Sequence, residues 1–431
     1  MTTADARHHP ATRLGGAGRV LSDGEVADFV AGQLAGIDAD GSSVCVLVPD
    51  GTRVCPLPLL VSAVHRALHG RVSRLTVLIA LGTHGAMSDE ALAAHLGYAG
   101  RDLRDVYPGT EVRNHEWWRP STFADLGTIP AARIEELSEG RMTGDVPVLL
   151  NRAVVDHDIA LVVGPVLPHE VVGMSGGNKY FFPGVAGQKI IDVSHWLGAL
   201  ITSAEIIGTT GLTPVRALIN DGAALIPART YAFSVVTASD SSASPGGALH
   251  SISFGDCVSS WADAAQVSAA THVTYLDAPV PRVLSLVPAM YDEIWTGAKG
   301  FYKVEPVVAD GGEVILYAPH IREIAASHPQ IHEIGYHCRD YFVKQWDAFK
   351  HVHWGVLAHS THLRGAGTYD AATGEERLRV DVTLATGIPQ EVCRAVNLGY
   401  RDPATIDPAA FGADPGTLVV PNAGEVLYRL R

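Results

Sequence analysis

The apolar positions in the first half of the chain form short continuous runs, separated by segments with a helical period. Val44–Val48, Leu75–Ala80 and Ile159–Val163 are apolar almost throughout, as buried parallel strands are. Leu57–Leu68 follows the first run and reads as an apolar helix that ends before Gly70. This alternation predicts an α/β fold built on a doubly wound, Rossmann-like parallel sheet.

The segments between and after these runs complete the predicted first domain. Residues 1–20 are expected to form a loosely held arm, and residues 238–247 (ASDSSASPGG) a solvated loop. Serine caps and helical patterns predict further helices at Ser22–Leu34, between Ser88 and Gly97, and at Ala131–Gly140, Leu197–Ile207 and Val215–Leu225.

The pattern restarts with a strand at Arg282–Val287, and 431 residues exceed one ordinary core. We therefore expect an N-terminal cofactor-binding domain over residues 1–271. A smaller α/β domain over residues 272–431 would serve substrate binding and closure, and its last residues could return to the first domain. The active site is expected in the cleft between them. Within the second domain we predict strands Glu313–Ala318 and Leu378–Thr383 and a helix Tyr336–Phe349.

Composition narrows the function classes. The net charge of −14 disfavours a nucleic-acid or anionic-membrane surface. No run approaches the ~20 apolar residues of a membrane span, and the N-terminus lacks a signal-peptide pattern. Five scattered cysteines without a C-x-x-C motif indicate reduced thiols. We expect a cytoplasmic protein.

A long segment rich in glycine and proline, Gly164–Trp196, contains His169, Lys179 and His195. It follows a predicted strand, where α/β sheets place their ligands. The run GMSGGNK lacks the G-K-[ST] ending of a phosphate-binding ATPase loop, which excludes that class. Lys179 could be a covalent anchor or a phosphate ligand. One imidazole does not make a metal site, so a metal at His195 would need ligands from a cofactor.

Two shorter loops, DGTR and GTHG, end the first two predicted strands. Asp50 could hold a ribose hydroxyl or orient a neighbour, and Thr52 and Arg53 could grip a phosphate or carboxylate. His84 lies between glycines, and an imidazole suits proton transfer near neutrality. The alternatives are an ordinary Asp-Gly turn with an exposed arginine, and a packing histidine.

The second domain adds Lys299, which follows Trp295 in an aromatic-rich segment. A histidine-rich stretch also occurs there, and an H-x-H pair on a strand can bind metal. Its members have no acidic or cysteine companions nearby, so we interpret the stretch as structural. The histidines concerned are His351, His353, His359 and His362.

Together these motifs resemble the nickel-pincer lactate racemase family. The resemblance rests on DGTR, GTHG, the run PHE…SGGNKYFFPG over residues 168–184, Ser194-His195 and Lys299-Gly300. It implies a nickel-pincer nucleotide cofactor, attached through Lys179 with nickel on His195, and cofactor-synthesis enzymes as partners. The resemblance assigns catalysis to His84, His169, Lys299 and Arg53, cofactor binding to Lys179, Asp50, Thr52, Arg53, Thr83, Ser175, Gly176 and Gly177, and substrate binding to Arg53, Trp295, Thr296 and Lys299.

The implied reaction is racemisation or epimerisation of a 2-hydroxy acid by proton-coupled hydride transfer. Thr296 stands where lactate racemase carries a glutamine, so we expect a different, larger 2-hydroxy acid. Two alternatives stay open. One is a cofactor-binding or carrier protein without turnover, and the other is a histidine-based metal-dependent hydrolase. Neither alternative needs a 2-oxo intermediate.

Overall fold

A computed structural model of the chain describes residues 8–238 and 247–431 and divides into two compact units. Unit 1 comprises the chain up to Leu167 together with Met174–Ile191 and Thr210–Thr271. Unit 2 comprises Pro168–Gly173, Asp192–Thr209 and His272–Arg431. The central segment of the sequence therefore contributes residues to both units.

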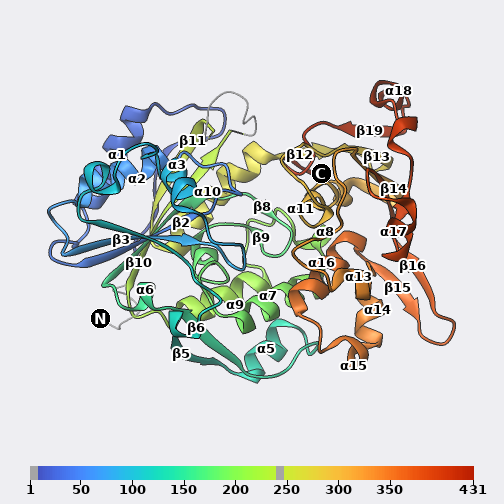
Figure 1. Cartoon of the computed structure of the whole chain (residues 1–431), viewed down its shortest axis with the longest axis horizontal. Helices are drawn as coiled ribbons and strands as arrows, with labels where there is room; N and C mark the ends of the chain where they lie inside the picture. Colours follow the sequence, from blue (N-terminus) through green and yellow to red (C-terminus); the bar gives the residue numbers. More distant parts are fainter. Residues whose placement is uncertain (1–7, 239–246) are drawn as a thin grey trace. The chain divides into compact units, whose positions relative to one another are not determined.

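Unit 1 is built on a mixed sheet of seven described strands in the order β1-β11-β10-β7-β2-β3-β4 (Figure 1). The pairs from β10 to β4 are parallel, whereas β11 pairs antiparallel with both β10 and the edge strand β1. Pairing of β1 with β11 corrects the expected loose arm, because Thr12–Gly15 is held in the sheet. The strands are β1 (Thr12–Gly15), β2 (Ser43–Pro49), β3 (Arg74–Ala80), β4 (Thr110–Asn114), β7 (Ile159–Pro165), β10 (Arg229–Thr237) and β11 (Leu249–Gly255).

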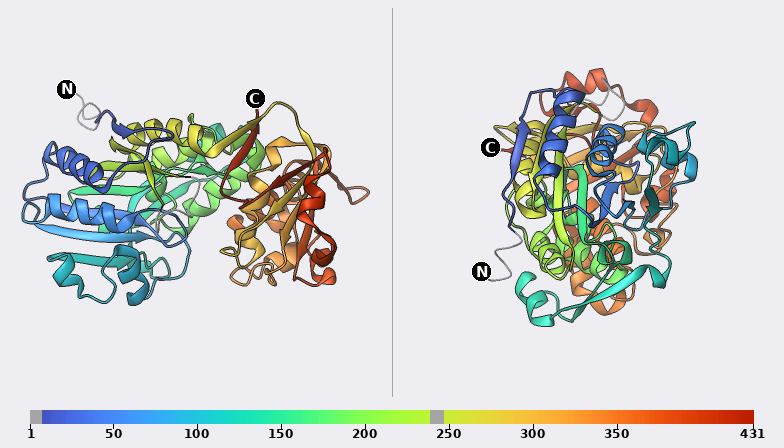
Figure 2. Two further views of the ribbon diagram at one scale, coloured as in Figure 1. Left: turned by 90° about the horizontal axis from the view of Figure 1, so that it is seen from above. Right: turned by 90° about the vertical axis from the view of Figure 1, so that its left-hand side faces the viewer.

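Helices α1 (Asp23–Ala35) and α2 (Leu57–Leu68) lie side by side on one face of this sheet (Figure 2). Ser22 caps α1 and forms a reciprocal capping box with Glu25, as the sequence predicts. Ser88 likewise caps α3, and Gly97 ends it in the left-handed conformation. The other helices of this unit's sequence are α3 (Asp89–Leu96), α4 (Leu103–Val106), α5 (Ala131–Leu137), α6 (Arg152–Val155), α9 (Pro214–Ala223) and α10 (Cys257–His272), with a hairpin of β5 (Phe123–Ile129) and β6 (Val146–Asn151).

The segment Gly164–Trp196 is more regular than its glycine content suggests. It contains the short strands β8 (Pro168–His169) and β9 (Gly173–Met174) and the 3-10 turn η3 (Gly177–Tyr180). Helix α7 (Gln188–Ile201) then begins directly after Gly187, so His195 is a helical residue and not a loop residue. The predicted helix Leu197–Ile207 is also wrong as a single element, because it is interrupted at Thr202 (φ 93°), which separates α7 from α8 (Ser203–Ile206).

Unit 2 contains a parallel sheet of five described strands in the order β18-β17-β14-β13-β19. The predicted strands correspond to β13, β14 and β17. The C-terminal strand β20, dark red in Figure 2, pairs in parallel with β12, so the chain ends within this unit. The strands are β12 (Val273–Leu276), β13 (Val280–Leu286), β14 (Val308–Ala318), β17 (Val380–Thr386), β18 (Gly399–Tyr400), β19 (Thr417–Val420) and β20 (Leu427–Leu430).

Short helices surround this second sheet. The predicted helix Tyr336–Phe349 is wrong as one element, because the backbone leaves the helical region at Gln345 (φ −118°). The helices are α11 (Ile294–Gly297), α12 (Lys299–Tyr302), α13 (Ile331–Ile334), α14 (Arg339–Lys344), α15 (Trp346–Phe349), α16 (Trp354–Arg364), α17 (Gln390–Ala395) and α18 (Pro408–Gly412).

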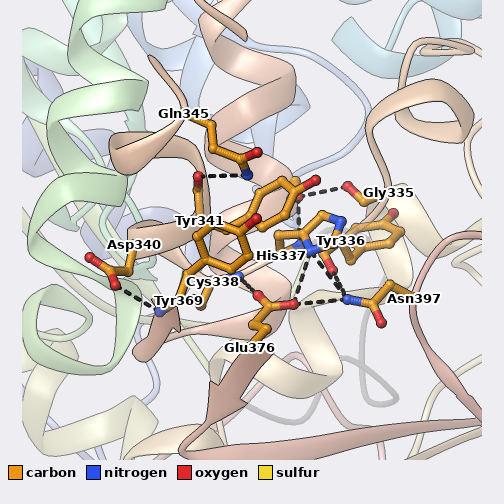
Figure 3. Close-up of polar contacts among 11 residues, drawn as sticks. Gly335, Tyr336, His337, Cys338, Asp340, Tyr341, Gln345, Tyr369, Glu376 and Asn397 are labelled. Carbon is orange, nitrogen blue, oxygen red and sulfur yellow. Dashed lines mark hydrogen bonds and ion pairs between the residues drawn. The ribbon is translucent and has the colours of Figure 1, made fainter. Parts of the chain in front are cut away.

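A polar cluster fixes the hairpin of β15 (Gly367–Asp370) and β16 (Glu375–Leu378) (Figure 3). The Glu376 carboxylate lies 2.9 Å from His337 Nδ1 and accepts hydrogen bonds from the Cys338 backbone N–H (2.6 Å) and the Asn397 amide (3.1 Å). His337 also stacks on Tyr341, with ring centroids 3.7 Å apart. Every partner in this cluster comes from a loop or helix next to the hairpin, so its evident role is structural.

The five cysteines are free and buried. Burial raises the pKa of each thiol, to about 12 for Cys45 and to about 11 for Cys338 and Cys393. Cys55 and Cys257 are shifted in the same direction. Within residues 8–238 and 247–431, no helix is long and apolar enough to cross a bilayer. The predicted loop at residues 238–247 falls almost wholly outside the described residues.

Candidate active site

The DGTR loop begins at the carboxyl end of β2, where Asp50 is 6% exposed. The Asp50 carboxylate accepts hydrogen bonds from the Thr52 hydroxyl (2.6 Å) and the Thr52 backbone N–H (3.1 Å). These bonds form an Asx turn that fixes the carboxylate in one orientation. Arg53 follows, half-buried, and its charge acts on the hydroxyl of the buried Tyr180.

Asp50 also holds the histidine of the neighbouring GTHG loop. His84 Nδ1 lies 2.5 Å from the second carboxylate oxygen, while the imidazole itself is largely exposed. Burial would raise the pKa of Asp50, but the hydrogen bonds and charge from His84 and the bonds from Thr52 lower it to about 2. An ionised Asp50 assigns the Nδ1 proton to this contact and leaves the lone pair of a neutral His84 on Nε2.

The GTHG loop is held by residues that the sequence analysis left without a role. The Trp117 indole N–H donates to the backbone oxygen of His84 (2.9 Å). The Asn114 side chain accepts from the Met87 backbone N–H and donates to the Met87 oxygen. Both come from the run Asn114-His115-Glu116-Trp117-Trp118 at the end of β4, the strand next to β3. Such a polar and aromatic run at a strand end was the available signal.

The glycine-rich segment contacts the same loop, because the Gly82 N–H donates to the Gly184 oxygen (2.9 Å). Thr83 is half-buried in the turn, and Lys179 is half-buried within η3. Ser175 is buried and uses its hydroxyl to accept from the Leu167 N–H (2.9 Å) and to donate to the Pro165 oxygen.

Two glycines of this segment are required by packing. A Cβ at Gly176 would lie 2.6 Å from the Val166 side chain, and one at Gly177 would lie 2.8 Å from Trp261 and the Cys257 oxygen. Both residues also have positive φ, at 84° and 57°. The structure thus explains these glycines by close approach to protein, and their contact with a cofactor stays a prediction.

Arg216 of α9 binds the backbone of the glycine-rich segment. It is 1% exposed, donates to the backbone oxygens of Met174 and Gly176, and stacks 4.2 Å over the Trp261 ring. Burial lowers the pKa of this guanidinium to about 9. Sequence reasoning missed Arg216, because nothing in a helix sequence indicates a partner 40 residues away.

The remaining predicted residues lie in unit 2. His169 is 6% exposed, and its Nδ1 accepts from the Val171 N–H at 3.1 Å, which places the proton of the neutral ring on Nε2. Glu170 Oε2 lies 3.6 Å from the same Nδ1. Burial raises the pKa of Glu170, but its interaction with His169, a backbone hydrogen bond and the Lys299 ammonium outweigh burial and hold this pKa well below its usual value.

Trp295, Thr296 and Lys299 lie on α11 and α12. Trp295 is stacked between His328 and His359, with ring centroids 3.8 Å away on each side. The Thr296 hydroxyl donates to the Glu293 oxygen in the preceding turn (3.2 Å). The Lys299 ammonium lies 5.1 Å from the centre of the Tyr291 ring.

The histidine-rich stretch is not a strand, which corrects the H-x-H interpretation. His353 is the N-terminal flanking residue of α16, and it is exposed like His351. His359 and His362 lie within α16 and are buried. His359 Nε2 lies 2.9 Å from the Trp295 oxygen, and burial lowers the pKa of His359 to about 3. His359 thus has the structural role expected of the stretch.

The predicted site residues therefore form two sets. In the described residues, no group of three His, Cys, Asp or Glu side chains could hold a metal ion. Binding of a metal to His195 with further ligands from a cofactor stays a prediction. Unit 1 contains Asp50, Thr52, Arg53, Thr83, His84, Ser175, Gly176, Gly177 and Lys179, and unit 2 contains His169, His195, Trp295, Thr296 and Lys299.

Comparison with known proteins shows that the sequence is similar to lactate racemases. Residues 30–208 match the model of the lactate racemase N-terminal domain. The lactate racemase of Lactiplantibacillus plantarum is 24% identical over 155 residues, and that of Thermoanaerobacterium thermosaccharolyticum is 24% identical over 157 residues. Each of these matches covers 36% of this chain and only 32% of the relative.

Solved structures extend the similarity to nearly the whole chain. A crystal structure of a Thermotoga maritima protein is 33% identical, covers 97% of this chain and 100% of that protein, and superposes with a TM-score of 0.85. The lactate racemase apoprotein of Thermoanaerobacterium thermosaccharolyticum shares the fold, with a TM-score of 0.70 at 16% identity, over 95% of this chain and 93% of that protein.

Proposed function

Because this chain belongs to the lactate racemase-like family, we propose that it racemises or epimerises a 2-hydroxy acid. The observation that carries the proposal is the contrast between its two histidines. Asp50 directs the Nδ1 proton of His84 and leaves a lone pair on Nε2, whereas the Val171 N–H leaves the Nε2 of His169 protonated. One ring is thus set to accept a proton and the other to donate one.

This pair suits a reaction that passes through a 2-oxo acid. Carbanion formation next to a carboxylate would create a dianion, whereas loss of the α-hydrogen as hydride avoids it. His84 takes the hydroxyl proton of one enantiomer, and His169 returns a proton to the oxygen when the opposite face is reduced. In the reverse direction the two histidines exchange roles, as microscopic reversibility requires.

The residues present fit the nickel-pincer nucleotide that the resemblance implies. Lys179 offers an amine for a thioamide, Thr52 and Arg53 offer donors for a phosphate, and His195 offers an imidazole to nickel. When bound, this cofactor would supply the hydride acceptor.

Substrate binding is proposed for the second set of residues. Lys299 would pair with the substrate carboxylate, and Arg53 would assist it from the DGTR loop. Thr296 uses its hydroxyl within its own turn, so it offers the substrate only a small side chain. A glutamine at this position would extend further, and we therefore propose a substrate larger than lactate.

The test uses protein produced together with the cofactor-synthesis enzymes and a 2-hydroxy acid deuterated at the α-carbon. Hydride transfer predicts that the inverted product retains deuterium, because hydride does not exchange with water. His84→Gln should abolish inversion while the fold is kept, which shows that inversion depends on the proposed base. Complete loss of deuterium to solvent, or hydrolysis with zinc and no inversion, would overturn the proposal. Nickel bound without any turnover would favour a carrier protein.

A further inference from the structure

The interior of unit 2 contains a group of buried polar atoms that the residues discussed so far do not satisfy. His362 is 3% exposed, and neither of its ring nitrogens has a hydrogen-bond partner among the described residues. The same holds for the Tyr302 hydroxyl, in a side chain 3% exposed, and for Nδ1 of His359. Buried polar groups in native proteins almost always have a partner, which for these atoms can be a bound water or a group of a ligand.

Tyr302 lies in α12, the helix that begins at Lys299 of the proposed substrate site. The Tyr302 ring lies 6.0 Å from His362 and 6.4 Å from His359, centroid to centroid. Glu170 is close enough to Tyr302 and His362 for its charge to raise the pKa of both side chains. His195 is close enough to His362 to lower the pKa of that ring. Glu170 in turn follows His169 and interacts with Lys299. The unpaired atoms therefore lie beside the groups proposed to hold substrate.

The chemistry of the group restricts what could bind there. Burial lowers the pKa of His362 to about 4, so the neutral ring presents one donor and one acceptor. The Tyr302 phenol is also neutral, because burial raises its pKa well above its usual value. A second substrate carboxylate would meet the ionised Glu170, and an alkyl or phenyl group would leave all these atoms unpaired. A hydroxyl group both donates and accepts, and matches them.

We propose that His362 and Tyr302 bind hydroxyl groups on the substrate beyond its α-carbon, so that the substrate is a polyhydroxylated 2-hydroxy acid of the aldonic acid class. This inference rests on the proposed racemase function and narrows its substrate. In this proposal His362 and Tyr302 contact the substrate and determine specificity. His359 is instead held by its hydrogen bond to the Trp295 backbone oxygen.

The experiment compares two acids with the same carbon chain, a tetronate and 2-hydroxybutanoate, which differ in their additional hydroxyl groups. The cofactor-loaded enzyme should prefer the tetronate by roughly 10- to 100-fold in kcat/KM. His362→Leu and Tyr302→Phe should each reduce this preference by about tenfold, because each removes a hydrogen bond to a hydroxyl.

Tyr107→Phe is the matched control. Tyr107 is another buried tyrosine, but it lies in unit 1, where its hydroxyl donates to the Leu96 backbone oxygen (2.8 Å). Its substitution should leave the preference between the two acids unchanged. A wild-type preference for 2-hydroxybutanoate or malate, or an unchanged preference in both His362→Leu and Tyr302→Phe, would overturn the inference.

Calorimetric titration of cofactor-free protein with the tetronate separates the two proposals. Binding that depends on His362, with no turnover by the loaded enzyme, would refute the racemase function and keep the hydroxyl site. Racemisation of both acids at equal efficiency, without tetronate binding that depends on His362, would keep the racemase function and refute the hydroxyl site. If Leu at position 362 prevents folding, His362→Gln, which retains a polar side chain, replaces it.

Discussion

At the scale of single residues, the Asp50 carboxylate both closes a turn and orients a histidine ring. It closes the DGTR turn through Thr52 and directs the His84 ring through Nδ1. This is the arrangement in which a buried carboxylate selects the tautomer of a catalytic base. The sequence alone indicates that the two loops lie near each other, because DGTR and GTHG end neighbouring parallel strands.

Asp50→Asn should therefore lower kcat/KM by about 10²-fold or more, because the amide can donate to Nδ1 and stabilise the wrong tautomer. Rates in both directions of racemisation would measure the effect. Asp102→Asn, at the exposed cap of α4, is the control and should change the rate little. Near wild-type rates for Asp50→Asn in both directions would rule out the orienting role.

Asp50 should also contribute to the dependence of stability on pH. Its folded pKa of about 2 lies below the usual 3.8, so its contribution is complete above about pH 4 and is lost as pH falls towards 2. Between pH 6 and pH 3 the wild-type chain should lose about 1 kcal/mol more unfolding free energy than Asp50→Asn. Urea titrations of both proteins across this range would measure the difference, and parallel pH profiles would contradict it.

His195→Ala tests the proposed metal ligand. Because His195 lies within α7 and is half-buried, and because alanine favours helix, the variant should fold. We expect it to lose nickel, measured by elemental analysis after production with the cofactor-synthesis enzymes. His84→Ala is the comparison and should retain the metal while losing activity. Stoichiometric nickel in His195→Ala would show that another group binds it.

At the scale of elements, α9 supports the glycine-rich segment through Arg216. Arg216→Met should leave the Met174 and Gly176 oxygens buried without donors, at a cost of about 1–3 kcal/mol for each. Arg216→Lys should recover only part of this, since an ammonium lacks the planar fork that reaches both oxygens. Chemical denaturation measures both variants, with the partly exposed Arg229→Lys as control. Equal stability of Arg216→Met and wild type would refute this role.

Elements with a regular apolar period were predicted well from sequence, and elements defined by their neighbours were not. Helix α2 occupies the predicted residues Leu57–Leu68, because its apolar face, proline start and glycine end all agree. Strand β1 was missed, since Thr12–Gly15 gains its structure from pairing with β11. The predicted helix Leu197–Ile207 included only the end of α7, and its first part was missed because Gln188 directly follows a segment rich in glycine and proline.

The same distinction applies to the candidate site. Motif residues such as His84 and Lys179 could be found because glycines mark the loops that hold them. Trp117 and Arg216 could not, because their roles depend on which backbone oxygen the fold brings to them. His362 could not either, since an unpaired buried nitrogen is a property of packing and has no local sequence pattern.

At the scale of the whole molecule, unit 2 depends on chain segments far from its main part. Trp196 of α7 stacks on Trp346 with ring centroids 5.4 Å apart, and Ser203 donates to the buried Glu305 carboxylate. The Arg339 guanidinium donates to the Leu200 oxygen at 2.8 Å. All three contacts join residues 192–209 to residues 272–431.

A fragment of residues 272–431 should therefore fold poorly by itself. Removal of Trp196 and Ser203 exposes apolar surface and leaves Glu305 with one partner fewer. We expect a broad, weakly cooperative unfolding transition in calorimetry, in contrast to the intact chain. Adding a peptide of residues 188–209 should partly restore cooperativity. A fragment as stable as the full chain would show that these contacts are dispensable.

The buried cysteines can report how often each unit opens locally. A thiol whose pKa is raised by burial reacts with alkylating reagents only when the surrounding structure opens. The alkylation rates of Cys45, Cys55 and Cys257 would report openings in unit 1. Those of Cys338 and Cys393 would report openings in unit 2. Mass spectrometry of a timed alkylation would thus show, without any introduced label, whether the two units open together or independently.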